Sequence, residues 1–267
     1  MFKILRIAVL LIILMSVWTT FLLQKNVSRH WQDSIDIKII PVVADTAPQT
    51  KKFVAQLKEK HFANIERYLS SQARRYQQDL ESSIQISIGE LIDDAPPSTP
   101  NSNQSTLDII WWSLKLRWWA WRNQPDDYHD TQIRMYVLYQ SPENDKPLPH
   151  STGLQNGLIG LIQPRADSKY RNLHATTITH ELLHIFGATD KYNIASGQPI
   201  YPQGYANSKN GYRYPQNRAE IMARAIPLKN GQFEVATRLG QTVIGAITAS
   251  EIGWISNATS NTRTTSE

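Results

Sequence analysis

Alternating apolar and polar residues predict strands along the first two thirds of the chain, and helical spacing predicts the segments between them. Strand character is found in four stretches, residues 34–43, 83–91, 132–140 and 157–163. Helical spacing is found in four others, residues 50–80, 106–122, 173–186 and 246–255. Polar loops rich in Pro, Gly, Asn or Ser are expected at 93–106 and 191–218. Strands and helices that alternate in this way predict an α/β (α+β) fold class.

The strand at 157–163 leaves two interpretations open. It precedes the helix at 173–186 by a short loop, where an edge strand could bind an extended peptide through its free backbone groups. It could equally be an ordinary interior strand.

The helix at 106–122 is unusually rich in tryptophan. Apolar residues occupy most of its circumference in the stretch LDIIWWSLKLRWWAW (107–121), and Asp108, Lys115 and Arg122 form a narrow polar line. We expect such a helix to be buried in the core. Contact with a membrane surface is the alternative, because tryptophan beside Lys and Arg also suits a lipid interface.

The first thirty residues differ from the rest. Lys3 and Arg6 precede a run of 17 uncharged, mostly apolar residues at 7–23, a length that approaches the hydrocarbon thickness of a bilayer. No small-x-small cleavage site follows, which favours an uncleaved transmembrane signal anchor over a cleaved signal peptide. The positive-inside tendency then predicts a cytoplasmic N-terminus at 1–6 and an extracytoplasmic domain, periplasmic or extracellular, at 31–257, with a polar tail at 258–267.

Composition narrows the chemistry further. A chain of 267 residues with 41% hydrophobic residues is sufficient for one sizeable domain. The 28 basic and 23 acidic residues are scattered, without the basic stripe of nucleic-acid-binding proteins, so no nucleic-acid partner is expected. The absence of cysteine excludes thiolate metal sites and cysteine nucleophiles. Any metal must be bound by His, Asp or Glu.

The stretch HELLHIFGATDKY (180–192) carries the clearest chemical signal. On a helix, His180 and His184 project from one face and can bind one ion, while Glu181 can face a metal-bound water. A catalytic zinc site usually has three protein ligands. Gly187 can end the helix in the left-handed conformation and return Asp190 to the ion, although Asp190 could instead cap the turn.

This stretch resembles the H-E-x-x-H-x-x-G-x-x-D-x-Y signature of the snapalysin-like and immune-inhibitor-A-like zinc peptidases, within the zincin and metzincin class. The resemblance implies one Zn²⁺ bound by His180, His184 and Asp190, with Glu181 as general base. It also implies a zincin/metzincin-like catalytic domain, with a mixed twisted sheet, an active-site helix and a turn that contains methionine beneath the metal. Met222 is suitably placed for that Met-turn.

One position departs from the pattern. Some metzincins have a tyrosine two residues after the methionine, where this chain has Arg224. The group that stabilises the oxyanion is therefore left open among four candidates: Tyr192, Tyr212, Tyr214 and Arg224. By contrast, His174 lies six residues before His180, so we expect it to be turned away from the metal face and to be structural or at the rim.

Together these features predict a membrane-anchored zinc endopeptidase that hydrolyses peptide bonds in a protein or peptide substrate by a Glu-assisted metal-bound water. Membrane contact is expected through residues 7–23 and, in the alternative above, through 107–121. Two other functions are kept open: a non-catalytic, membrane-tethered binding protein with the same fold, and a zinc hydrolase that acts on a non-peptide bond.

Overall fold

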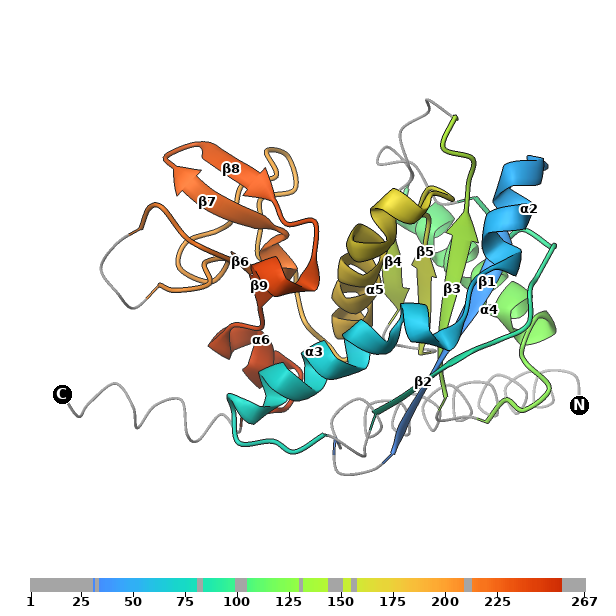
Figure 1. The fold of residues 1–267 in the computed structure, drawn as a ribbon, viewed down its shortest axis with the longest axis horizontal. Coiled ribbons are helices and arrows are strands. Elements are labelled where there is room, and N and C mark those ends of the chain that lie inside the picture. Colours follow the sequence, from blue (N-terminus) through green and yellow to red (C-terminus); the bar gives the residue numbers. More distant parts are fainter. Residues whose placement is uncertain are drawn as a thin grey trace, which may run out of the picture.

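A five-stranded sheet forms the centre of the computed structural model (Figure 1). The structure describes residues 31, 34–80, 84–98, 105–129, 132–143, 151–154, 158–208 and 213–255. The strand order is β2-β1-β3-β5-β4, and all neighbours are parallel except β4 and β5. The bounds are β1 (Ile35–Val43), β2 (Ile84–Ile88), β3 (Ile133–Tyr139), β4 (Thr152–Leu154) and β5 (Ile159–Ile162). The predicted α/β class with a mixed sheet is therefore confirmed.

Apolar residues cover both faces of this sheet, as expected where helices pack on each side. Along β1, Ile37 and Ile39 belong to one buried cluster, and Ile40 and Val42 belong to a second. The two clusters alternate because successive side chains of a strand point to opposite faces. The sheet therefore separates two distinct cores.

Helices cover the two faces unequally. The first cluster includes residues of α2 (Pro48–Ala55), α3 (Ala63–Arg74) and α5 (Arg171–Ile185), whereas the second includes residues of α4 (Thr106–Arg122). Figure 1 shows α5 between the sheet and the C-terminal part of the chain, with α4 behind the sheet. The helix that carries the HELLH motif and the tryptophan-rich helix thus lie on opposite faces.

The single helix predicted at 50–80 is wrong. The chain forms α2, a short 3₁₀ turn η1 (Glu59–His61) and then α3. A straight helix over the predicted range would be about 45 Å long, too long to stay on this sheet. The break lets Val54 of α2 and Ile65 and Leu69 of α3 enter the same core.

Short elements make up the C-terminal part. Two small sheets pair β6 (Ala219–Glu220) with β9 (Thr242–Val243), and β7 (Ala225–Lys229) with β8 (Gln232–Val235). The remaining elements are the 3₁₀ turns η2 (Ser168–Tyr170), η3 (Ile221–Ala223) and η4 (Leu239–Gln241), and the helix α6 (Ala246–Glu251). Both η3 and η4 pack against α5, so the C-terminal part of the chain covers the side of α5 that faces away from the sheet.

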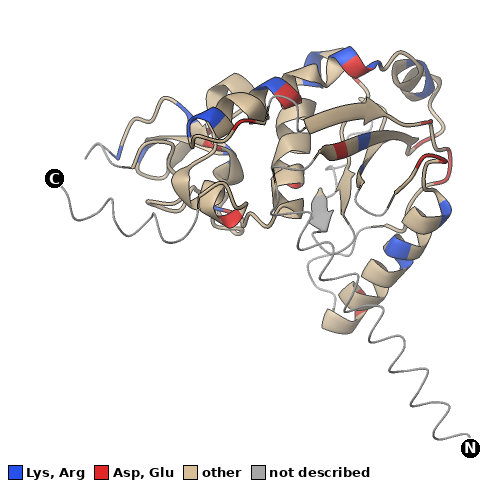
Figure 2. Ribbon diagram, turned by 90° about the horizontal axis from the view of Figure 1, so that it is seen from below, with Lys and Arg blue, Asp and Glu red and all other residues tan. Residues whose placement is uncertain are grey.

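The expected burial of α4 is wrong for most of the helix. Only Leu116, Trp119 and Ala120 are buried, against the second cluster, and three tryptophans are 58–63% exposed: Trp111, Trp118 and Trp121. A helix that is apolar all round can bury only the side that faces its sheet unless a further layer covers it. Lys and Arg, and Asp and Glu, are scattered over many elements of the described chain (Figure 2).

No helix within the described ranges combines the length and the apolar character needed to cross a bilayer. The predicted anchor at 7–23 and the polar tail at 258–267 lie outside those ranges.

Trp31 generates a prediction about stability, because it joins the two ends of the described chain. Its ring centroid lies 4.2 Å from that of Phe186 and 5.3 Å from that of Trp254, and its Nε1 donates to the carbonyl oxygen of Ile252 at 2.6 Å. Trp31→Ala should lower the free energy of unfolding by about 3–5 kcal/mol, since it opens a large cavity and leaves a carbonyl unpaired. Urea unfolding measures this loss.

The exposed Trp121 is the matched control for that substitution. Trp121→Ala removes the same side chain from a position that is 63% exposed, so the free energy of unfolding should change by about 0.5 kcal/mol or less. Equal losses for the two variants would contradict the assignment of Trp31 to the core.

Candidate metal centre

The two histidines of the motif lie one turn apart on α5, so both imidazoles leave the helix on the same side. His180 is 4% exposed and His184 is half-buried. The helix ends at Ile185 with Phe186 as its C-cap, and Gly187 follows with φ of 99°, a left-handed conformation that glycine adopts without strain. The chain reverses there and brings Asp190 back towards the histidines.

Three side-chain atoms converge at this point. Asp190 Oδ1 lies 3.3 Å from His180 Nε2 and 3.3 Å from His184 Nε2. The two Nε2 atoms are 3.2 Å apart. Within the described residues, these three side chains form a group whose potential ligand atoms all lie within 4.8 Å of one another.

Hydrogen bonds on the other side of each ring decide which nitrogen carries the proton. His180 Nδ1 lies 3.1 Å from the carbonyl oxygen of Ile221, and His184 Nδ1 lies 2.8 Å from that of Ala188. A carbonyl oxygen can only accept, so each Nδ1 donates and each neutral ring keeps its lone pair on Nε2. Two lone pairs and a carboxylate therefore face one another, and such an arrangement attracts a cation.

The surroundings of Asp190 fit a ligand better than a turn cap. Its Oδ1 is buried and accepts no hydrogen bond from the described residues. A carboxylate that capped the turn after Gly187 would accept from a nearby backbone N–H. Two imidazoles and a carboxylate are donors of the kind that bind Zn²⁺, so the residues present fit this ion.

The three groups also shift one another's protonation. Burial raises the pKa of Asp190, but the interactions with His180 and His184 outweigh it and hold that pKa well below its usual range. Burial lowers the pKa of His184, but Asp190 and Glu181 outweigh it and raise that pKa. Both shifts have one physical cause, which is the stabilisation of positive charge beside Asp190.

An ion pair between a buried lysine and a partly exposed glutamate holds the segment that follows the candidate third ligand. Lys191 is 1% exposed, and its Nζ donates to both carboxylate oxygens of Glu251 in α6, at 2.8 and 2.7 Å. It also donates to the carbonyl oxygen of Thr189 at 2.8 Å. Gly204 packs on the same segment so closely that an added Cβ would lie 2.3 Å from the carbonyl oxygen of Lys191. Contacts on both sides thus fix the backbone next to Asp190.

Met222 is completely buried in the turn η3. The backbone of this turn contacts both α5 and the segment that carries Asp190. Ile221 accepts the hydrogen bond from His180, and the carbonyl oxygen of Met222 accepts one from the backbone N–H of Lys191 at 3.0 Å. The turn therefore connects the motif helix to the segment that carries Asp190.

Sequence reasoning missed Glu220, which holds this turn. Its carboxylate is fully buried and accepts hydrogen bonds from the backbone N–H groups of Met222 and Gly245, at 2.6 and 3.1 Å, and from the Thr248 hydroxyl at 2.7 Å. Burial raises the pKa of Glu220 against the effect of these bonds. A glutamate two residues before Met222 was the only signal in the sequence, and it does not reveal the distant partners.

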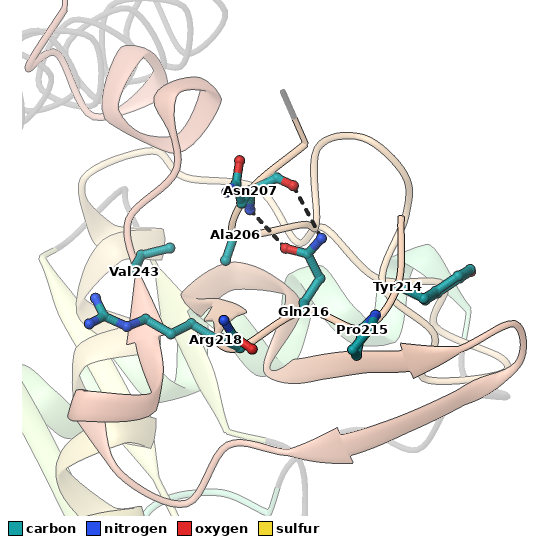
Figure 3. Close-up of a pocket in the computed structure, with 8 residues that line it drawn as sticks. Ala206, Asn207, Tyr214, Pro215, Gln216, Arg218 and Val243 are labelled. Carbon is teal, nitrogen blue, oxygen red and sulfur yellow. Dashed lines mark hydrogen bonds between the residues drawn. The ribbon is translucent and has the colours of Figure 1, made fainter. Parts of the chain in front are cut away.

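The structure places two of the four candidates for oxyanion stabilisation at the cleft in front of α5 and a third in another pocket. Tyr192 and Arg224 both line the cleft in front of α5, and the Arg224 guanidinium lies 5.9 Å from the Tyr192 ring centroid. Arg224 has φ of 63°, an uncommon conformation for a residue with a Cβ, at the end of η3. Tyr214 lines a different pocket with Gln216 and Arg218 (Figure 3), and its hydroxyl pairs with that of Tyr205 at 3.0 Å. Tyr212 lies outside the described residues.

The cleft in front of α5 has a volume of about 480 Å³ and contains Glu181 together with the three converging residues. Glu181 is 5% exposed, and burial raises its pKa against the opposing effects of His180, His184 and Arg224. His174 lines the same cleft, but it is not part of the cluster. Burial lowers the pKa of His174 to about 4, so its ring is neutral at physiological pH.

Comparisons with known proteins add little to this geometry. No model of a known protein family matches the chain, and no curated protein matches it. A chain in the structure of a chaperone–substrate complex shares 13% identity and a TM-score of 0.36, over 83% of this chain and 33% of that chain. Archaemetzincin from Methanopyrus kandleri shares 13% identity and a TM-score of 0.30, over 61% of this chain and 79% of that chain. This chain therefore spans about a third of the first of these proteins, and similarity this low supports no conclusion about fold or function.

The Lys191–Glu251 pair generates a prediction about the segment beside Asp190. Glu251→Gln should lower the free energy of unfolding by about 3 kcal/mol, because it leaves the buried Lys191 ammonium without an opposite charge. Lys191→Met should cost less, because the carboxylate that it leaves behind is 25% exposed and can be hydrated. Urea unfolding of both variants and of the double variant measures the coupling.

In the double variant both charges are gone, so much of the loss caused by Glu251→Gln should be recovered. A larger loss for Lys191→Met than for Glu251→Gln would contradict this account of the ion pair.

Proposed function

We propose that this chain is a zinc-dependent endopeptidase. One observation carries the proposal: His180 Nε2, His184 Nε2 and Asp190 Oδ1 lie within 3.3 Å of one another, and both rings donate from Nδ1 to backbone carbonyls. These donors lie in a cleft beside a buried glutamate. That combination serves metal-assisted hydrolysis and has no evident purpose in a purely structural site.

His180, His184 and Asp190 would hold the zinc ion. When bound, the ion supplies a Lewis acid that polarises a substrate carbonyl and acidifies water. The hydrogen bonds to Ile221 and Ala188 keep both rings in the tautomer and orientation that ligation requires.

Glu181 acts as the general base in this proposal. It follows His180 directly, so its side chain points about 100° around the helix from the ligand and towards the cleft. Its carboxylate takes a proton from the attacking water and returns it to the leaving amine when the peptide bond breaks. The raised pKa that burial gives Glu181 brings this carboxyl closer to the pH at which it must both accept and donate.

Arg224 and Tyr192 are the groups of this chain that can face the developing negative charge on the carbonyl oxygen. Both line the cleft with Glu181, and both are hydrogen-bond donors. Arg224 is cationic, so we assign it the main part in this stabilisation, with Tyr192 beside it, since the guanidinium lies 5.9 Å from the Tyr192 ring centroid.

The sheet edge supports a peptide as the substrate. β5 lies between β3 and β4, so of the two interpretations of 157–163 the interior strand is correct and the peptide-binding edge strand is wrong. β4 is the edge strand, and Ser151 just before it lines the cleft. An extended peptide could pair with the outer backbone groups of β4, which no described strand uses, and run past Glu181.

We also place the catalytic domain outside the cytoplasmic membrane, on the sequence pattern at 1–23 alone. In cells, the full chain should stay with membranes after a carbonate wash, and protease added from outside should digest its domain. Release of a soluble chain that begins near residues 24–28 would show a cleaved signal peptide instead.

Zinc content and peptide hydrolysis, measured together on variants of Asp190 and Glu181, test the main proposal. Asp190→Ala should lose most of its zinc on dialysis and lose hydrolysis, because two imidazoles alone bind zinc far more weakly. Asp190→His should regain zinc, since it restores a third ligand at the same place. Glu181→Gln should keep one zinc per chain and lose hydrolysis by about 10²–10⁴-fold, as expected when only a general base is removed.

Each variant has an outcome that contradicts its assigned role. Full zinc content in Asp190→Ala would show that Asp190 is not a ligand, and unchanged turnover in Glu181→Gln would show that Glu181 is not the base. A wild-type chain that binds zinc but cleaves nothing in an unbiased peptide library would favour a non-peptide substrate or a binding protein.

A further inference from the structure

The outer side of α4 presents a continuous apolar stripe. Five of its residues recur every three or four positions, and Ile110 lies one turn before Leu114, so all six share one side of the helix. They are 52–76% exposed: Leu107, Ile110, Trp111, Leu114, Trp118 and Trp121. The stripe follows a helix about 25 Å long. Contiguous apolar surface of this kind marks an interaction site rather than ordinary exposed residues.

Basic residues border this stripe. Three cations, Lys115, Arg117 and Arg122, stand on α4 against one acidic residue, Asp108, whose carboxylate is engaged in the N-terminal capping box with Ser105. The Lys115 ammonium lies 5.6 Å from the Trp111 ring centroid, and the Arg122 guanidinium lies 5.1 Å from that of Trp118. The cations therefore lie along the margin of the apolar stripe.

The inner side of α4 is already used. Leu116, Trp119 and Ala120 pack on the sheet, and Trp119 Nε1 donates to the Asp94 carboxylate at 3.1 Å. These contacts fix the rotation of α4 about its own axis, so the outer stripe always faces away from the sheet as a ridge. The sheet lies between this ridge and α5, so occupation of the ridge does not require any change at the metal centre.

We propose that this outer face of α4 binds the surface of an anionic lipid bilayer, with the helix lying in the plane of the interface. Exposed tryptophans suit the boundary between headgroups and acyl chains, where the ring is buried and the indole N–H stays hydrated. Apolar side chains at this depth reach about 5–10 Å into the bilayer, while flanking Lys and Arg meet the phosphates. This proposal is independent of the proposed zinc chemistry.

Charge distinguishes this occupant from a second copy of the chain. Two copies that met through α4 would bring together two helices with the same excess of positive charge, which opposes association. An anionic bilayer instead offers phosphate charges to all three cations and an apolar layer to the whole stripe. An acidic protein partner would also satisfy the cations, but it would not bring the stripe within reach of a quencher carried by lipid.

A fluorescent probe on α4 in the full chain tests the proposal. Because the chain has no cysteine, Leu114→Cys allows an environment-sensitive fluorophore to be attached on the stripe alone. Vesicles of phosphatidylcholine and phosphatidylglycerol should shift its emission to the blue, nitroxide-labelled lipids should quench it, and aqueous iodide should quench it less. The probe reports only on its own surroundings, whether or not residues 7–23 also hold the chain on the vesicle.

Matched variants control for position and for charge. A probe on Ile194→Cys, 86% exposed in the loop after Tyr192, should show none of these changes. Lys115→Gln and Arg122→Gln should each lower the equilibrium ratio of lipid-inserted to water-exposed probe by about fivefold. The same charge change at the exposed Lys51 and Lys52 of α2 should leave it unaltered.

Three results would overturn the proposal. The first is a probe at position 114 that does not respond to anionic vesicles while circular dichroism shows a folded chain, with Leu107→Cys as the second probe position. The second is an equal blue shift of the probe when the protein concentration is raised without vesicles, which would show that the stripe binds a second copy of the chain. The third is that the Lys51 and Lys52 variants weaken lipid insertion of the probe as much as the Lys115 and Arg122 variants do, which would show that only the net charge of the chain matters.

Discussion

Two hydrogen bonds that leave the imidazoles of α5 determine the character of the whole site. Because Ile221 and Ala188 accept from the Nδ1 atoms, both Nε2 lone pairs turn towards Asp190, and the pocket between them attracts positive charge. One acceptor is close in sequence, just after the end of the helix, while the other lies 41 residues downstream. The site is therefore complete only when the turn at Met222 is docked on α5.

The C-terminal part of the chain serves that docking. Glu220 joins the turn to Gly245 and Thr248 at the start of α6, and Glu251 at the end of α6 holds Lys191, next to Asp190. Both connections use buried charge or buried hydrogen bonds, which break at high cost once water is excluded. Elements too short to be stable alone thus form a rigid wall opposite the HELLH motif.

The helices on the two faces of the sheet are covered to different extents. On one face, α5 is enclosed by α3 and the C-terminal part, and its polar residues point into a cleft. On the other face, α4 is the covering helix in the described part of the chain, so its outer side faces outwards with its tryptophans exposed. The helix is apolar over most of its circumference, but the described part of the fold buries only the side that faces the sheet.

The sequence alone was sufficient for the features that depend on near neighbours. The α/β class, four of the five strands of the central sheet, and the positions of α4 and α5 follow from periodicity. The meeting of His180, His184 and Asp190 follows from helical spacing and a reversal at Gly187. Tertiary structure decided what depends on distant partners: the break between α2 and α3, the edge position of the three-residue strand β4, and the selection of Tyr192 and Arg224 over Tyr214 at the cleft. Glu220 and the exposure of α4 belong to the same group, because a local pattern specifies which side chains are apolar or charged but not which other surfaces will cover them.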